Sequence, residues 1–340
     1  MLRYNRQRSH MRFGVIYQSF DPPSVFLDYV RLIEDSGFDY LWVCDSSLHA
    51  RDVFGYLTLA AVHTTRLRLG VSVHQPYTRH PAMNVNGMAT VNEISGGRAI
   101  MAVGTGDRPQ IELGFQPAPV ALVRDMIHVS RSLLAGESVT FANSAFRLEG
   151  ARIRHDGGHG MPIYVACSGP KMLSLAGEVA DGVLMLCGAT PDTISLALSN
   201  VADGALRAGR SVADIDVAWG AATVIDDSRQ AALDQTRLMA AWYANHSPRY
   251  AAAAGAAPAL VASMQSRERG TNLHEARAAA ALASDEVVDR LALAGPAPYV
   301  RERIALAREL GIDHFELFLI GPQKQETLKH FANEVMPTFR

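Results

Sequence analysis

Side chains that can move protons follow two short apolar runs in the first quarter of the sequence. Asp45 directly follows residues 41–44, and His74 directly follows residues 70–73. A carboxylate or an imidazole can act as a general acid or base when a substrate comes within hydrogen-bond reach. Asp45 could equally cap a helix, and His74 could be only structural, so the sequence leaves both roles open for each residue.

Small and polar residues also follow the apolar run that begins at Ala99. The segment consists of Gly104, Thr105, Gly106 and Asp107. It contains only part of the G-x-G-x-x-G pattern with which dinucleotide-binding folds approach a pyrophosphate. The segment is therefore either a plain turn after a strand or a place where backbone approaches a cofactor.

The apolar run that begins at Ile163 ends in a segment that can begin a helix. The segment consists of Ser168, Gly169, Pro170, Lys171 and Met172. Ser168 or Gly169 suits the capping position, and Pro170 suits the first helical position. Free N–H groups at such a helix start can hold a phosphate, although an ordinary cap is the alternative. Ala166 stands where the G-x-S-x-G elbow of a serine hydrolase needs glycine, which argues against that chemistry.

The composition points to a small-molecule partner. The chain has 340 residues with 32 basic and 34 acidic side chains, so its formal net charge is only −2. This balance predicts no nucleic-acid partner and no anionic membrane surface. Three scattered cysteines and the lack of an H-E-x-x-H motif predict a cytoplasmic protein without a metal site. We find no signal peptide and no apolar stretch near the roughly 20 residues that span a bilayer.

Strand-like apolar runs recur along most of the chain, with segments of helical periodicity between most of them. Eight such runs begin at Phe13, Tyr40, Leu67, Ala99, Ile163, Gly182, Ile215 and His314. Several are apolar at nearly every position, as parallel strands buried on both faces are. Eight βα units predict an α/β fold of one (β/α)8 TIM barrel.

We expect a single barrel domain over residues 11–340, preceded by a tail of residues 1–10. Two insertions interrupt the regular alternation. Residues 138–161 predict a short hairpin, and the Ala-rich residues 240–297 predict a helical excursion. Long insertions at a barrel mouth commonly shape the substrate pocket.

Several ordered segments together resemble the luciferase-like flavin and deazaflavin oxidoreductases. The closest branch is that of the methylenetetrahydromethanopterin reductases. The resemblance rests on residues 41–45 (LWVCD), 76–81 (PYTRHP), 104–107 (GTGD), 168–172 (SGPKM) and 175–182 (LAGEVADG), and it extends over roughly residues 11–225 and again near the last strand. It implies a luciferase-like TIM barrel with insertions that binds coenzyme F420 or FMN.

The resemblance also assigns cofactor contacts. The ring of the cofactor would lie across the carboxyl ends of the strands, backed by a bulge in the third strand that often contains a non-prolyl cis peptide bond. The matching positions are Val71, Ser72 and Val73. Residues 104–107 would approach the polar edge of the ring or its side chain, and residues 168–172 would hold the phosphate.

The acid–base residues depart from the family pattern. Many deazaflavin relatives place a histidine directly after the aspartate that ends the second strand, where this chain has Ser46. His49 is the nearest histidine, so our candidates for catalysis are Asp45, His74 and His49. In the family that the chain resembles, the methanopterin reductases also carry an acidic residue in the first strand. This chain has Ile16 or Tyr17 at that position.

We therefore predict an oxidoreductase that transfers a hydride between a reduced deazaflavin or flavin and a small organic substrate. The alternatives are an FMN-dependent monooxygenase that uses oxygen and a flavin-binding protein without catalytic activity. The resemblance further implies a homodimer or a higher homo-oligomer.

Overall fold

The computed structural model describes residues 10–106, 108–265 and 273–340. They divide into two compact units. The first unit comprises Gly14–Leu184 and Val201–Asp216, and the second unit holds the rest of the described chain. An element that crosses a boundary is given below with the unit that holds most of its residues. Nearly all of the predicted tail, and the candidate residue Asp107, lie outside the described residues.

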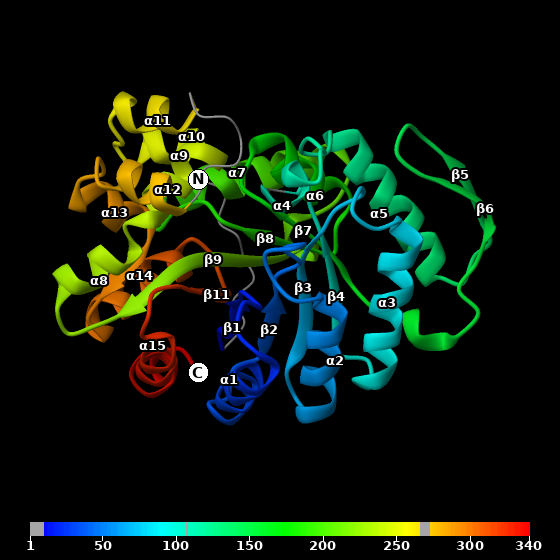
Figure 1. Cartoon of the computed structure of the whole chain (residues 1–340), viewed down its shortest axis with the longest axis horizontal. Coiled ribbons are helices and arrows are strands. Elements are labelled where there is room, and N and C mark those ends of the chain that lie inside the picture. The colour runs from blue at the N-terminus through cyan, green and yellow to red at the C-terminus, as the bar shows by residue number, and fades with distance from the viewer. Residues whose placement is uncertain (1–9, 107, 266–272) are drawn as a thin grey trace. The chain divides into compact units, whose positions relative to one another are not determined.

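The first unit alternates strands and helices. Its strands are β1 (Arg12–Tyr17), β2 (Tyr40–Val43), β3 (Arg68–His74), β4 (Ala99–Val103), β5 (Val139–Ala142), β6 (Arg147–Ala151), β7 (Ile163–Cys167) and β8 (Gly182–Met185). Its helices are α1 (Pro23–Asp35), α2 (Val53–His63), α3 (Pro81–Ile94), α4 (Arg108–Glu112), α5 (Val120–Leu134) and α6 (Pro170–Val179), with the 3-10 turn η1 (Asp156–Gly158). Figure 1 shows α2, α3 and α5 following one another beside β3 and β4.

The main strands of this unit lie in the order β1, β2, β3, β4, β7 and β8. The pairs from β1 through β7 are parallel. Parallel strands place all their carboxyl ends at one edge, so the segments that follow β1, β2, β3, β4 and β7 begin near one another. Every residue of β2 and β4 is buried, as the apolar character of these runs predicts.

A large side chain and a glycine complement each other between neighbouring strands. Gly70 of β3 pairs with Trp42 of β2. A Cβ atom at Gly70 would lie 2.1 Å from the indole ring of Trp42, which also packs against Tyr164 with 5.5 Å between ring centroids. The sequence therefore needs glycine at position 70 because the indole occupies the space of a side chain.

The predicted hairpin within residues 138–161 is present as the antiparallel pair β5 and β6. Figure 1 shows this pair projecting beyond α5. The turn η1 follows it and packs on α3, because the side-chain amide of Asn92 donates 2.8 Å to the carbonyl of Gly157.

The second unit contains the remaining predicted strands and most of the later helices. Its strands are β9 (Asp216–Ile225), β10 (Leu293–Gly295) and β11 (His314–Leu319), and β9 pairs with both others in parallel. Its helices are α7 (Pro191–Arg207), α8 (Arg229–Thr236), α9 (Leu238–His246), α10 (Pro248–Ala253), α11 (Pro258–Gln265), α12 (Leu273–Ala280), α13 (Asp285–Leu291), α14 (Ala297–Glu309) and α15 (Lys324–His330), with the short turns η3 (Phe331–Val335) and η4 (Met336–Thr338). The turn η2 (Val212–Asp214) belongs to the first unit. All eight predicted strands are thus present, and the described part of residues 240–297 is mostly helical as expected. Among the described residues, no helix is both long and apolar enough to cross a membrane.

Helix α6 and the end of α7 pack closely enough to exclude side chains at two glycines. A Cβ atom at Gly204 would lie 1.9 Å from the carbonyl oxygen of Ser174, and one at Gly177 would lie 2.1 Å from that of Val201. We expect Gly204→Ala to lower the free energy of unfolding by about 1–3 kcal/mol, because a backbone atom cannot move aside cheaply. Urea unfolding of the purified protein measures this change.

Gly55→Ala is the matched control for this prediction. Gly55 also lies in a helix, but a Cβ atom there would have nothing within 4 Å. The control should leave stability unchanged or raise it by up to about 1 kcal/mol, because alanine favours a helix more than glycine does. Equal effects of the two substitutions would contradict the packing argument.

Candidate active site

The structure brings Asp45 and His74 together at the carboxyl ends of β2 and β3. The carboxylate Oδ2 of Asp45 lies 2.8 Å from Nδ1 of His74 and 2.5 Å from NH1 of Arg79. Because a carboxylate only accepts hydrogen bonds, Nδ1 of His74 carries the proton that it donates. Both partners are almost withdrawn from solvent, with 6% of the Asp45 side chain exposed and none of the His74 side chain.

A second carboxylate extends this cluster to helix α2. The other guanidinium nitrogen of Arg79 donates 3.1 Å to Asp52, which caps α2 by accepting from the N–H groups of Phe54 and Gly55. The ring of Phe54 packs against His74, with 5.3 Å between ring centroids, and lies under the guanidinium of Arg79 at 5.2 Å. Arg79 thus fixes Asp45 relative to the start of α2.

Asp45 is ionised in the folded protein. Burial by itself raises the pKa of a carboxyl group, but the hydrogen bonds and charges of His74 and Arg79 outweigh it and hold the pKa of Asp45 below its ordinary value. Nε2 of His74 is buried and has no hydrogen-bond partner within the described part of the chain. The imidazole is therefore held by Asp45 at one nitrogen only.

His74 lies directly after an irregular part of β3. The register between β3 and β4 shifts between Val71 and His74, and the Ser72–Val73 peptide bond is cis. The cis bond and the bulge are what the family resemblance implies for these positions. The N–H group of Gly104 donates 2.9 Å to the carbonyl of His74, so the first residue after β4 holds the end of the bulge.

The residues after β4 pack against this bulge. A Cβ atom at Gly104 would lie 2.9 Å from Val73 and 3.0 Å from the carbonyl oxygen of Ala166, so only glycine fits there without displacement. Gly106 has a φ of +78°, a conformation that glycine adopts freely. Gly104 thus lies in close contact with both β3 and β7.

The segment after β7 begins α6 as predicted. Gly169 is the capping residue, Pro170 lies in the first turn, and no side chain caps the helix. The first N–H groups of any α-helix have no partner within the helix, so those of Lys171 and Met172 can bind an anion. A Cβ atom at Gly169 would meet nothing within 4 Å, which leaves room beside these groups.

His49 does not join Asp45 and His74. Its Nε2 atom instead lies 2.5 Å from the carboxylate of Glu112, at the end of α4. The pair links the segment after β2 to the segment after β4. Our sequence reasoning missed Glu112, because nothing in the spacing of these residues indicates the contact.

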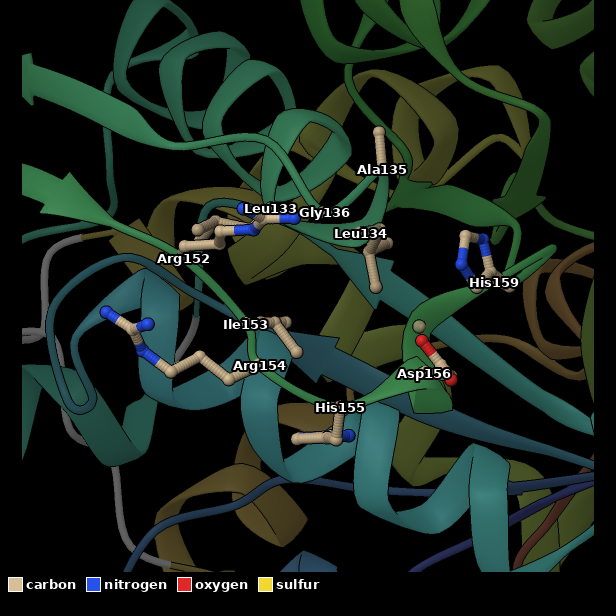
Figure 2. Close-up of a pocket in the computed structure, with 11 residues that line it drawn as sticks. Leu133, Leu134, Ala135, Gly136, Arg152, Ile153, Arg154, His155, Asp156 and His159 are labelled. Carbon is tan, nitrogen blue, oxygen red and sulfur yellow. The ribbon is translucent and has the colours of Figure 1, made fainter.

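A polar hollow of about 360 Å³ lies elsewhere in the first unit. Figure 2 shows Arg152 and Arg154 on one side of it and Asp156 and His159 on the other. Its walls are the end of α5 and the chain that leads into β7, so it lies near the amino ends of the strands. It is therefore away from the carboxyl edge that holds the candidate residues.

The family of the chain follows from its sequence as a whole. The model of the family described as luciferase-like monooxygenase matches residues 6–314. The chain belongs to this family. The resemblance that we inferred from separate motifs is thus confirmed.

Two relatives of this luciferase-like protein are similar over nearly their whole lengths. The 5,10-methylenetetrahydromethanopterin reductase of Methanolobus tindarius is 30% identical over 334 residues, which cover 96% of this chain and 100% of the relative. The F420-dependent glucose-6-phosphate dehydrogenase of Microbacterium testaceum is 26% identical over 358 residues, which cover 100% of this chain and 98% of the relative.

A solved structure confirms the fold class of the luciferase-like chain. The coenzyme F420 dependent tetrahydromethanopterin reductase from Methanopyrus kandleri superposes with a TM-score of 0.85 and 27% sequence identity, over 97% of this chain and 100% of that one. The luciferase-like chain therefore has the predicted (β/α)8 TIM-barrel fold with insertions.

The buried charge of Asp45 predicts how stability depends on pH. Asp45→Asn should lower the free energy of unfolding by about 2 kcal/mol near neutral pH, the usual contribution of hydrogen bonds to a charged group. Because the folded-state pKa lies below the ordinary value of 3.8, this stabilisation is present above pH 3.8 and is lost as the pH falls through the folded-state pKa. Urea unfolding at several pH values tests this.

The exposed Asp28 provides the control for this measurement. Its carboxylate pairs with Arg31 on the surface of α1, where 64% of its side chain is exposed. Asp28→Asn should change stability by less than about 0.5 kcal/mol, as exposed ion pairs do. The free energy of unfolding of Asp45→Asn should approach that of the wild type in acid. If the difference between the two stays unchanged there, the role given to the charge of Asp45 is wrong.

Proposed function

We propose that this protein is an oxidoreductase that transfers a hydride between coenzyme F420 or FMN and a small organic substrate. One observation carries the proposal. A chain that is similar over its full length to F420-dependent enzymes keeps open space at Gly169, beside the uncapped start of α6. Both cofactors carry a phosphate that this helix start is able to bind.

We assign the contacts of the cofactor to three segments of the first unit. The N–H groups of residues 171 and 172, with Ser168, would bind the phosphate. The backbone at Gly104, Thr105 and Gly106 would lie beside the polar part of the cofactor, and the bulge at residues 71–73 would back the ring. Asp107 belongs to the same assignment by its place in the sequence.

The bound cofactor would supply the hydride, and the protein would supply placement and proton handling. In this proposal Asp45 and His74 keep the bulge in place, because the His74 side chain is tied to Asp45 and its carbonyl oxygen is tied to Gly104. Their near-complete burial excludes water from the back of the ring. His49 is the remaining candidate acid–base residue and is the one that solvent reaches.

We leave the substrate as a small organic molecule. The names of two relatives specify a methylenetetrahydromethanopterin and a glucose 6-phosphate. This chain departs from the reductase pattern at Ser46 and in β1, where Tyr17 instead donates 2.5 Å to Asp21. We therefore infer neither substrate for it. We further propose a homo-oligomer, as the family resemblance implies, and a cytoplasmic location, in keeping with three free cysteines.

Equilibrium titration of the purified protein with F420 and with FMN, each oxidised and reduced, tests the cofactor assignment. We follow binding by fluorescence and expect F420 to bind more tightly, because relatives that are similar over nearly the whole chain are named as F420-dependent. Tighter binding of FMN would favour the monooxygenase alternative, and oxygen consumption would then be measured. If neither cofactor binds below the millimolar range, the proposed function is wrong.

Gly169→Leu tests the phosphate site. The backbone angles of Gly169, φ −77° and ψ 148°, suit any residue, and the space around its Cβ position is empty, so the variant should keep its melting temperature. The new side chain would occupy the room for the phosphate, and the affinity for FMN should fall at least tenfold.

Riboflavin, which lacks the phosphate, is the internal control. Its affinity should change less than threefold in Gly169→Leu, because the ring contacts lie on other strands. If the substitution lowers the affinities for riboflavin and FMN equally, or lowers neither, the phosphate does not lie at the start of α6.

A further inference from the structure

The pair of His49 and Glu112 joins the loop after β2 to helix α4 at the carboxyl edge of the first unit. We propose that His49 is the proton donor and acceptor for the substrate, and that Glu112 orients its imidazole. This inference rests on the proposed function and deepens it. It assigns to His49 the role that Ser46 cannot fill, and it adds Glu112 to the site.

The position of the pair supports this role. His49 lies in the segment after β2, and Glu112 lies in α4 after β4, while β3 runs between these two strands. A contact between the two segments therefore crosses the carboxyl end of β3, where Val73 and His74 lie. This is the region that we assign to the ring of the cofactor.

The loop that carries His49 is held in a defined conformation. The carbonyl of Ser46 accepts hydrogen bonds from the N–H groups of His49 at 3.1 Å and Ala50 at 2.8 Å. Leu48 has a φ of +66°, a left-handed conformation that a leucine rarely adopts, and 77% of it is exposed. An unfavourable conformation at an exposed leucine is hard to explain by packing, but it turns the next residue, His49, toward Glu112.

Exposure separates His49 from the other candidate acid–base residues. A catalytic proton donor must regain its proton from solvent after each turnover. The side chain of His49 is 28% exposed and that of Glu112 is 38% exposed, whereas His74 is fully buried. His49 can exchange protons with water, and His74 is better suited to positioning.

The reaction step balances for a ketone or imine substrate. The bound cofactor would supply a hydride, which would bring two electrons to the substrate carbon. The π electrons of the C=O or C=N bond move to oxygen or nitrogen, which takes a proton from the His49 imidazolium. Neutral His49 then regains a proton from water, and the carboxylate of Glu112 keeps its charge throughout. In the reverse direction neutral His49 accepts the proton.

Chemical modification tests the position of His49 without any substrate. Diethyl pyrocarbonate acylates exposed neutral imidazoles, and mass spectrometry gives the rate at each histidine. We expect saturating FMN or F420 to slow the modification of His49 at least fivefold. His63, exposed at the far end of α2, should react at the same rate with and without cofactor. A cofactor that binds but leaves His49 unprotected overturns the inference, whereas a cofactor that does not bind overturns the proposed function.

Two substitutions test the chemical role. His49→Ala should lower turnover of cyclic ketones or imines by about 100-fold or more, the usual range for general acid catalysis, and added imidazole should restore part of it. Glu112→Gln should lower turnover by roughly tenfold, since it keeps a hydrogen-bond acceptor but loses the charge. Both variants should keep the wild-type melting temperature and bind FMN and F420 within about threefold of wild type.

A purely structural pair would give a different result. The melting temperature would then fall in both variants, cofactor affinity would fall with it, and imidazole would restore nothing. Any of these three outcomes, or full turnover in His49→Ala, overturns the proposed role of the pair.

Discussion

The carboxylate of Asp45 carries a negative charge in a place that solvent barely reaches, and a buried charge is costly unless partners compensate it. His74 and Arg79 provide this compensation from β3 and from the loop before α3. Arg79 in turn binds Asp52 at the start of α2. The ends of two strands and the start of a helix are therefore fixed to one another by a single charge. The bulge of β3 lies between these fixed points, so its shape depends on them.

The parallel arrangement of the strands determines where chemistry can occur. Segments after β2, β3, β4 and β7 begin at one edge, and each carries polar groups or glycines. Gly104 packs against both the bulge and β7, while Gly169 leaves space open. The hollow near the amino ends of the main strands holds no cluster of buried charge, because its charged side chains are exposed. A cavity by itself thus indicates less about function than the direction of the strands does.

The departure at Ser46 gains a physical meaning from the loop that follows it. Family members with a histidine directly after the aspartate place an imidazole beside the strand end. In this chain the carbonyl of Ser46 closes a turn, and the left-handed Leu48 turns His49 toward Glu112. An acid–base group three residues farther along can still lie over β3, because the loop folds back.

The sequence by itself determined the eight strands, the barrel, the family and the segments of the candidate site, because these follow from apolar periodicity and from local motifs. The start of α6 is likewise local, since Gly169 and Pro170 specify a cap without help from distant residues. Only the tertiary structure decided which acid–base residues meet. Asp45 pairs with His74 and Arg79, and His49 pairs with Glu112 across 63 positions of the chain. Such contacts depend on side-chain direction and on the register of neighbouring strands, and neither quantity is encoded in the spacing of residues along the sequence.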